Sequence, residues 1–186
     1  RKIRDDCLKA GEVSMATGSV QVYYGAGRGK SPAALGRAIR AAAEGKTVFI
    51  IQFLKGKSDE EMEFLKRLEP EIKFFRFEKS EEYFSELSEE EQLEEVKNIK
   101  NGINFAKKVL TTGECDLVIL DEVLGLVDHG LIDAEELKTL IGARLDDTDL
   151  IMTGWVLSDE LRPYIDEIYH LIPEKIPEKK GKDIDN

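Results

Sequence analysis

A glycine-rich segment near the start of the chain carries the residues best suited to chemistry. Its sequence is GAGRGKS, and its alternating glycines let the backbone turn tightly and approach a ligand closely. The amides of such a turn form an anion nest beside the positive end of the following helix. The lysine can neutralise phosphate oxygens, and the serine can reach a divalent ion. We therefore expect a polyphosphate to bind Gly25, Ala26, Gly27, Arg28, Gly29, Lys30 and Ser31.

The spacing of this loop differs from the general Walker pattern of phosphate-binding loops. That pattern has a glycine six residues before the lysine, where this chain has Tyr24, and the first glycine here stands five residues before Lys30. A turn that only joins a strand to a helix is the alternative. The lysine, the serine and the flanking segments favour a binding site.

A second pattern lies where a metal ion would be needed. The apolar run LVIL ends in Asp121 and Glu122. This is the Walker B form, in which acids stand at the carboxyl end of a strand near the loop of the first strand. A solvated strand end with a helix-capping aspartate is the alternative, and the presence of the glycine loop argues against it.

Both patterns need a sheet that brings the ends of several strands together. Apolar segments without clean alternation predict strands that are covered on both faces. We expect six strands, at Ser19–Tyr24, Thr47–Phe53, Ile72–Phe77, Asp116–Leu120, Asp149–Thr153 and Glu167–Ile172. Helical patterns occupy Ala33–Glu44, Asp59–Leu68, Ser88–Leu110, Asp133–Ile141 and Ser158–Ile165. This alternation predicts an α/β fold with a mostly parallel six-stranded sheet and helices on both faces.

Capping signals support several of these helix boundaries. Gly45 follows the first helical pattern as a C-terminal cap, and Ser88 with Glu91 resembles a capping box. Asp133 and Ser158 are good N-caps for the last two helices.

Charge and cysteine content limit the partners. The 186 residues carry a net charge of −11, and residues 57–97 hold 15 acids against 7 bases. Such a balance disfavours nucleic acid and anionic membranes as partners. No apolar run reaches the length of about 20 residues that spans a bilayer. Cys7 and Cys115 form no disulfide framework, so we expect a cytoplasmic protein.

Taken together, these segments resemble the ATP:corrinoid adenosyltransferases of the BtuR/CobO/CobA type. The opening VQVYYGAGRGKSPAALGRAIRAAAEGKTVFIIQFLKG contains that family's variant loop, GxGxGK[ST], and the Gln52–Gly56 segment after the second strand. Leu117–Glu122 and the Thr153-Gly154 pair are further matches. The resemblance spans residues 19–173, which we take as one domain between an N-terminal segment, 1–18, and a charged tail, 174–186.

The resemblance implies a RecA-like P-loop fold, usually in a homodimer. It implies an enzyme that transfers the 5′-deoxyadenosyl group of ATP to the cobalt of a reduced corrinoid, in adenosylcobalamin biosynthesis or salvage. In that family ATP lies reversed in the loop, so that triphosphate leaves, and the resemblance implies a reductase partner that supplies cobalt(I). Mg²⁺ is held by the loop hydroxyl and a strand acid, by position Ser31 and Glu122, with Asp121 beside them. Lys30 and Glu122 are then the catalytic residues.

The sequence departs from the family at two positions that bear on the site. The family usually has threonine where this chain has Pro32, and proline lacks the N–H that would bind a phosphate. One charge-assisted hydrogen bond is worth about 1.5–3 kcal/mol, so we expect ATP binding or turnover to be weaker by roughly tenfold to a hundredfold. Trp155 stands where the family often has arginine, and it either stacks on the nucleoside or only packs.

The corrinoid side of the site is less defined by the sequence. Tyr83 and Phe84 are candidates to cover the macrocycle, with Phe75 and Phe77 behind them; aromatic residues of the core are the alternative. Two other functions stay open. One is a nucleotide- or corrinoid-binding protein with impaired transfer, and the other is a different P-loop phosphotransferase or NTPase.

Overall fold

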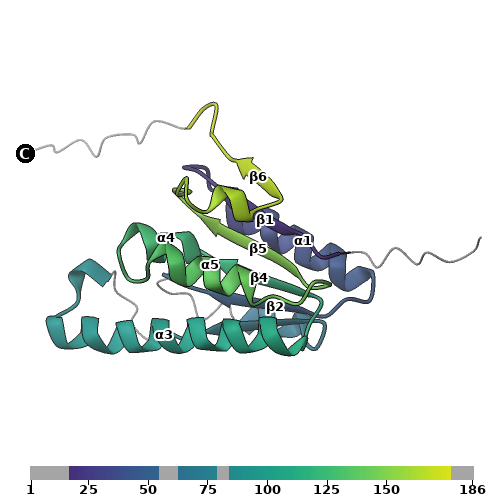
Figure 1. The fold of residues 1–186 in the computed structure, drawn as a ribbon, viewed down its shortest axis with the longest axis horizontal. Coiled ribbons are helices and arrows are strands. Elements are labelled where there is room, and N and C mark those ends of the chain that lie inside the picture. Colours follow the sequence, from purple (N-terminus) through teal and green to yellow (C-terminus); the bar gives the residue numbers. More distant parts are fainter. Residues whose placement is uncertain (1–16, 55–62, 79–83, 177–186) are drawn as a thin grey trace, which may run out of the picture.

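The structure is a computed structural model that describes residues 17–54, 63–78 and 84–176. Its centre is one six-stranded parallel sheet in the order β3-β2-β4-β5-β1-β6 (Figure 1). The strands are β1 (Val20–Tyr24), β2 (Val48–Gln52), β3 (Ile72–Arg76), β4 (Leu117–Asp121), β5 (Asp149–Gly154) and β6 (Glu167–His170). The expected α/β class and all six predicted strands are confirmed, with boundaries shifted by a residue or two.

Helices cover both faces of this sheet. Helix α1 (Lys30–Ala43) lies on one face, where Ala34 and Ala38 pack against Ile50 and Ile119. The other face is covered by α3 (Glu89–Thr112), α4 (Val123–Asp128) and α5 (Ala134–Gly142), with which it forms the larger apolar core. No helix in the described part of the chain has both the length and the apolar character needed to cross a membrane.

Local capping explains where the helices begin and end. Ser88 and Asp133 each form a complete capping box, with Glu91 and Glu136 as their partners. Helix α1 ends just before Gly45, which has a φ of +83°. The predicted capping signals at these three helices are therefore confirmed.

One predicted helix is wrong, one observed helix was not predicted, and one prediction is described only in part. The predicted helix Ser158–Ile165 is wrong, because this segment holds only a short 3₁₀-helix, η3 (Arg162–Tyr164). Pro163 disfavours helical backbone at the residue before it, and the chain must be extended again at Ile165 to enter β6. Helix α4 was not expected, because its buried run Val123–Leu126 has no polar face to reveal a helical period. The predicted helix Asp59–Leu68 is described only from residue 63, and it ends in η1 (Lys66–Leu68).

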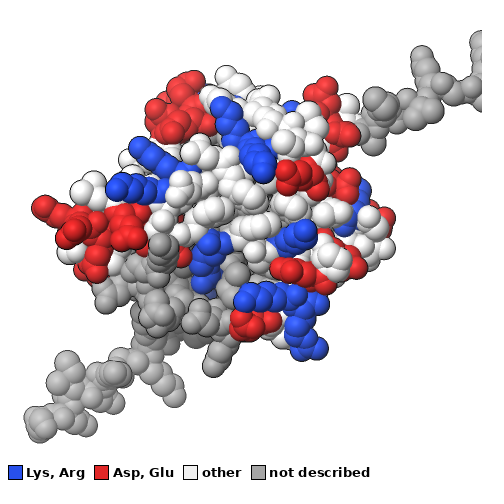
Figure 2. Space-filling model, turned by 90° about the horizontal axis from the view of Figure 1, so that it is seen from below, with Lys and Arg blue, Asp and Glu red and all other residues white. Residues whose placement is uncertain are grey.

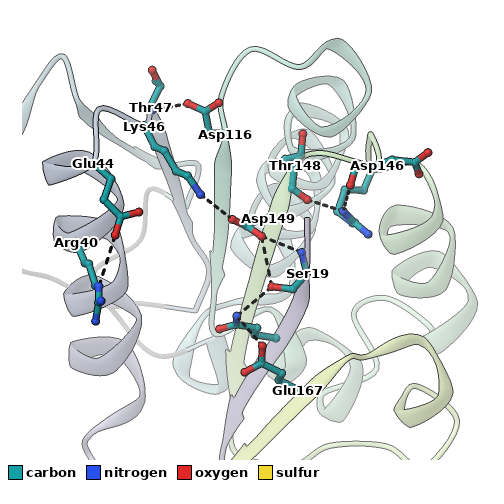
Figure 3. A network of polar contacts seen from close by, with 12 residues as sticks. Ser19, Arg40, Glu44, Lys46, Thr47, Asp116, Asp146, Thr148, Asp149 and Glu167 are labelled. Atoms are coloured by element: carbon teal, nitrogen blue, oxygen red, sulfur yellow. Dashed lines mark hydrogen bonds and ion pairs between the residues drawn. The ribbon is translucent and has the colours of Figure 1, made fainter. Parts of the chain in front are cut away.

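Acidic side chains tie the amino ends of the strands together (Figure 3). The Asp149 carboxylate accepts hydrogen bonds from the Ser19 backbone N–H at 2.8 Å and from Lys46 Nζ at 3.4 Å. Asp116 likewise accepts from the Thr47 N–H at 2.8 Å. Because the strands are parallel, this network holds the register of the sheet from the end opposite to the glycine loop.

Cys115 is a free thiol in the core beside β4. Burial raises its pKa from 9.0 to about 12, so the reactive thiolate is scarce near neutral pH. In a Cys7→Ser variant, which leaves one thiol, we expect thiol reagents at pH 8 to label the folded protein very slowly and the urea-unfolded protein fully. Fast labelling of the folded protein would contradict this packing.

The same burial makes the stability of the fold depend on pH. The pKa of the Cys115 thiol is higher in the folded protein than in the unfolded chain, so its contribution to the free energy of unfolding is complete below pH 9 and is lost as the pH rises toward about 12.

Candidate active site

The glycine loop lies at the carboxyl end of the sheet, between β1 and α1. Gly25 has a φ of +124°, and a Cβ atom there would stand 2.4 Å from the Leu171 carbonyl oxygen. Its own N–H donates to the Gly154 carbonyl at 3.1 Å, at the end of β5. The loop therefore requires glycine at its first position, and two neighbouring segments hold it in place.

Most backbone N–H groups of the loop have no acceptor within the described part of the chain. Gly27 donates to the Leu171 carbonyl at 3.3 Å, and Pro32 has no N–H. Helix α1 begins here without a side-chain cap and without an acid in its first turn. Among the described residues no acceptor meets the amides of Ala26, Arg28, Gly29, Lys30 and Ser31. These five donors at the positive end of a helix fit an anionic ligand with several oxygens.

The Lys30 side chain folds back over the loop. Its ammonium donates to the carbonyls of Gly25 at 2.8 Å and Gly27 at 2.9 Å, and Lys30 is only 5% exposed. The ring of Trp155, which follows β5, covers the ammonium with its centroid 4.8 Å from Nζ. A full positive charge is thus held within the nest of amides.

Ser31 and Asp121 meet at the edge of the loop. Ser31 Oγ donates to Asp121 Oδ1 at 2.7 Å, and Thr153 Oγ1 donates to the same oxygen at 2.7 Å. Glu122 follows in a left-handed conformation, with a φ of +61°, and its N–H donates to Thr153 Oγ1 at 2.8 Å. The strand acid that contacts the loop hydroxyl is therefore Asp121, while Glu122 lies at the next position.

These oxygen atoms fit a magnesium ion. Mg²⁺ prefers oxygen ligands and usually takes one or two from the protein, with the remainder from phosphate and water. Ser31 and Asp121 supply a hydroxyl and a carboxylate in contact with each other, and Glu122 lines the same cleft. The described residues contain no group of three or more carboxylate, histidine or cysteine ligands, so the metal site would be completed by the ligand's own phosphates.

A cleft of about 1,240 Å³ opens from the loop along the face of the sheet that α1 covers. Binding sites for small molecules usually measure about 300–1,000 Å³, so this one has room for more than a triphosphate. Its polar end is formed by the loop, Asp121, Glu122 and Trp155, and its apolar end includes Ile50, Leu65 and Phe74.

Gln52 also lines this cleft and was not predicted as a site residue. It ends β2 opposite Asp121 of β4 and Arg76 of β3, and its side-chain oxygen accepts from Arg76 Nη2 at 3.1 Å. Thr153 was likewise missed, although it binds Asp121. The signal that could have found both is a polar residue at the end of an otherwise apolar strand.

The described aromatic candidates for the second half of the site, Phe75, Phe77 and Phe84, are not among the residues that line the cleft. Tyr83 lies outside the described residues, and Phe84 begins a short 3₁₀-helix, η2 (Phe84–Glu86). Phe75 and Phe77 pack on Phe105 of α3, on the opposite face of the sheet. Trp155, by contrast, lines the cleft.

One face of the molecule carries positive and negative side chains side by side (Figure 2). On the face shown in Figure 2, lysines and arginines are separated by acidic and uncharged residues, and within its described part they form no continuous basic patch. This face therefore lacks the basic stripe on which sequence-independent binding of nucleic acid depends.

Comparison with known proteins adds independent information. Residues 16–185 match the family described as ATP:corrinoid adenosyltransferase BtuR/CobO/CobP. The chain is 28% identical to a corrinoid adenosyltransferase of Escherichia coli K12, over 85% of this chain and 78% of that protein. It is 27% identical to the corrinoid adenosyltransferase CobA of Salmonella typhimurium, over 94% and 87% of the two chains.

Two further similarities are of a more general kind. An uncharacterised protein of Nostoc is 30% identical over 78% of this chain and 40% of its own length. Among solved structures, ATPases 2 and 3 of EssC from Geobacillus thermodenitrificans align with 90% of this chain and 36% of theirs, at a TM-score of 0.45 and 16% identity.

Proposed function

The chain belongs to the ATP:corrinoid adenosyltransferase family, whose match covers residues 16–185, and we propose that it transfers the 5′-deoxyadenosyl group of ATP to the cobalt of a reduced corrinoid. Membership makes it an adenosyltransferase of α/β P-loop architecture; the details of the reaction are our proposal. The observation that carries it is the set of five loop amides that meet no acceptor among the described residues, beside Lys30 and the Ser31–Asp121 pair. That set is suited to a triphosphate.

The proposed reaction is a displacement at the 5′ carbon of ATP. Cobalt(I) provides the electron pair for the new cobalt–carbon bond, and the carbon–oxygen bond to the triphosphate breaks. The bond's electrons leave with the triphosphate, so negative charge grows on the leaving group. The nucleophile comes from the corrinoid, and the protein needs only to place the two substrates and stabilise the departing charge.

The residues at the polar end of the cleft divide that work. The loop amides and Lys30 neutralise and hold the triphosphate, and Lys30 can do so without leaving its carbonyl partners. Ser31 and Asp121, with Glu122 next to them, would hold Mg²⁺, which when bound adds positive charge next to the leaving oxygens. Trp155 lines the same cleft, with its ring over the Lys30 ammonium.

The apolar end of the cleft and the partners of the protein complete the proposal. The apolar end of the cleft, at Ile50, Leu65 and Phe74, is where we place the nucleoside or the edge of the macrocycle. Corrinoid contacts by Tyr83 and Phe84, a homodimer, a reductase partner and a cytoplasmic location are carried over from the family or from the composition.

One assay tests the proposed function. The protein is given ATP, Mg²⁺ and chemically reduced cobalamin, the cobalt–carbon bond is followed by absorbance, and the phosphate product is identified. We expect adenosylcobalamin and inorganic triphosphate in equal amounts. Orthophosphate without adenosylcobalamin would instead identify an NTPase or phosphotransferase. Nucleotide binding without either product would identify the impaired binding protein.

Pro32 is the residue that favours impaired binding. It is the third residue of α1, it lines the cleft, and it removes one amide from the nest. We expect Pro32→Thr to bind ATP about tenfold to a hundredfold more tightly, since one hydrogen bond to a charged group is gained. Isothermal titration calorimetry measures the change. Pro32→Ala restores the N–H without a hydroxyl, and equal affinities of both variants and the parent protein would show that this amide is not used.

A further inference from the structure

The ammonium of Lys30 lies against the ring of Trp155 within the cleft. Both residues line the cleft, and the indole centroid lies 4.8 Å from Nζ. We propose that Trp155 is an affinity-determining residue that competes with the triphosphate for the Lys30 ammonium. The inference rests on the proposed function, because it takes the triphosphate of ATP as the ligand that displaces the indole.

A count of protons shows why the two compete. An ammonium group has three N–H donors. Two of them are used by the carbonyls of Gly25 and Gly27, at 2.8 and 2.9 Å, within the loop itself. The third must serve a phosphate oxygen, which has to come within hydrogen-bond distance, about 2.8 Å, of Nζ. Because Lys30 is only 5% exposed, the oxygen must approach from the cleft, where the indole lies.

The indole is held weakly enough to be displaced. Trp155 is 59% exposed, so most of its ring is not packed against the protein. Its backbone is anchored by the preceding Gly154, where a Cβ atom would stand 2.4 Å from Leu124 Cβ. The indole can therefore rotate away from Lys30 while the backbone at residue 155 stays in place. The interaction lost is one cation–π contact of a mostly exposed ring.

The size of the effect follows from that pair. Because the Trp155 ring is 59% exposed, we take the lower end of the range for cation–π contacts, about 0.5–1 kcal/mol, which corresponds to roughly a twofold to fivefold change in a dissociation constant. Removing the indole should therefore tighten the binding of triphosphate by that factor. If the indole instead stacked on the nucleotide, its removal would weaken binding.

The first measurement uses the fact that Trp155 is the single tryptophan of the chain. Its emission is followed while the protein is titrated with inorganic triphosphate and Mg²⁺, without nucleoside or corrinoid. We expect the emission to change with the same midpoint as the heat of binding, because the indole leaves the ammonium. In Lys30→Met the free protein should already show a different emission. An unchanged emission during calorimetrically proven binding overturns the inference.

The second measurement compares side chains at this position. Calorimetry with inorganic triphosphate should show Trp155→Leu binding twofold to fivefold more tightly, and Trp155→Phe, which keeps an aromatic face, binding closer to the parent protein. Val156→Ala shortens the neighbouring exposed apolar residue and should bind as the parent does. Equal or weaker binding by Trp155→Leu overturns the inference.

The experiments distinguish a wrong role for Trp155 from a wrong function for the loop. If the parent protein binds triphosphate and forms adenosylcobalamin while the leucine variant shows no gain, only the role of Trp155 is wrong. If neither the parent protein nor the leucine variant binds triphosphate, the loop is not a phosphate site and both proposals are overturned.

Discussion

Replacement of Lys30 by methionine should lower kcat/KM for adenosyl transfer by about a thousandfold. Removing one preorganised donor to developing charge typically costs 10² to 10³ in rate, and Lys30 also supplies the one full charge buried in the nest, so we expect the upper end of that range. Its ammonium lies among the loop amides and is only 5% exposed, so water cannot easily replace it. Methionine has a similar length without charge, and ATP affinity should fall together with the rate.

The control for this variant is Arg37→Met. It removes the same charge from an exposed position on the same helix, α1, and should change kcat/KM by less than about twofold. Circular dichroism and thermal unfolding of both variants establish that the fold is intact. Transfer by the Lys30 variant within tenfold of the parent rate would show that the triphosphate leaves from somewhere else.

The sequence was sufficient to predict that the glycine loop and the acids after LVIL lie at the same edge of the sheet. An alternating set of glycines between an apolar strand and an alanine-rich helix admits few structures, and the acids after LVIL mark the end of a buried strand. In a parallel sheet these ends meet at one edge. The contact between Ser31 and Asp121 at 2.7 Å is the result of that geometry.

What the sequence left open depended on which face each residue occupies. The family pattern pointed to Glu122 beside Ser31, whereas the structure places Asp121 there. Residues 117, 119 and 121 alternate onto the α1 face of β4, and the chain leaves the strand immediately afterwards with a φ of +61°. The same alternation sends Phe75 toward α3 and away from the cleft. The sequence spacing alone predicts neither placement. Side chains alternate between the two faces of a strand, but the alternation does not say which face the helix α1 covers.

The contact of Trp155 with Lys30 could not be predicted either. The two residues are 125 positions apart, and they meet because β5 lies next to β1 and the ends of both strands face the loop. Strand order in a parallel sheet is set by crossover packing over the whole domain. The residues around position 155 therefore do not reveal the order of the strands.

Replacement of Asp121 by asparagine should lower Mg²⁺-dependent transfer by about a thousandfold and weaken the apparent affinity for Mg²⁺. Asparagine keeps an oxygen in the position that accepts from Ser31 and Thr153, so the hydrogen bonds at 2.7 Å and the end of β4 can persist. The negative charge that attracts Mg²⁺ is lost. With the ion bound less well, the charge that develops on the departing triphosphate is stabilised less, and such stabilisation is worth about 10² to 10³ in rate.

Binding without metal gives this prediction its sharpest test. In the presence of a chelator, Asp121→Asn should bind inorganic triphosphate at least as tightly as the parent protein, because a carboxylate that repels the phosphates is gone. Glu122→Gln removes the neighbouring charge, and Asp149→Asn removes one at the far end of the sheet, beside Ser19 and Lys46. If Asp121 is the main ligand, the loss of Mg²⁺ affinity should be greatest for Asp121→Asn, smaller for Glu122→Gln and absent for Asp149→Asn. A larger loss of Mg²⁺ affinity in the Glu122 variant would show that Glu122 is the main protein ligand. Equal Mg²⁺ affinities in all three variants would show that the triphosphate alone binds the ion.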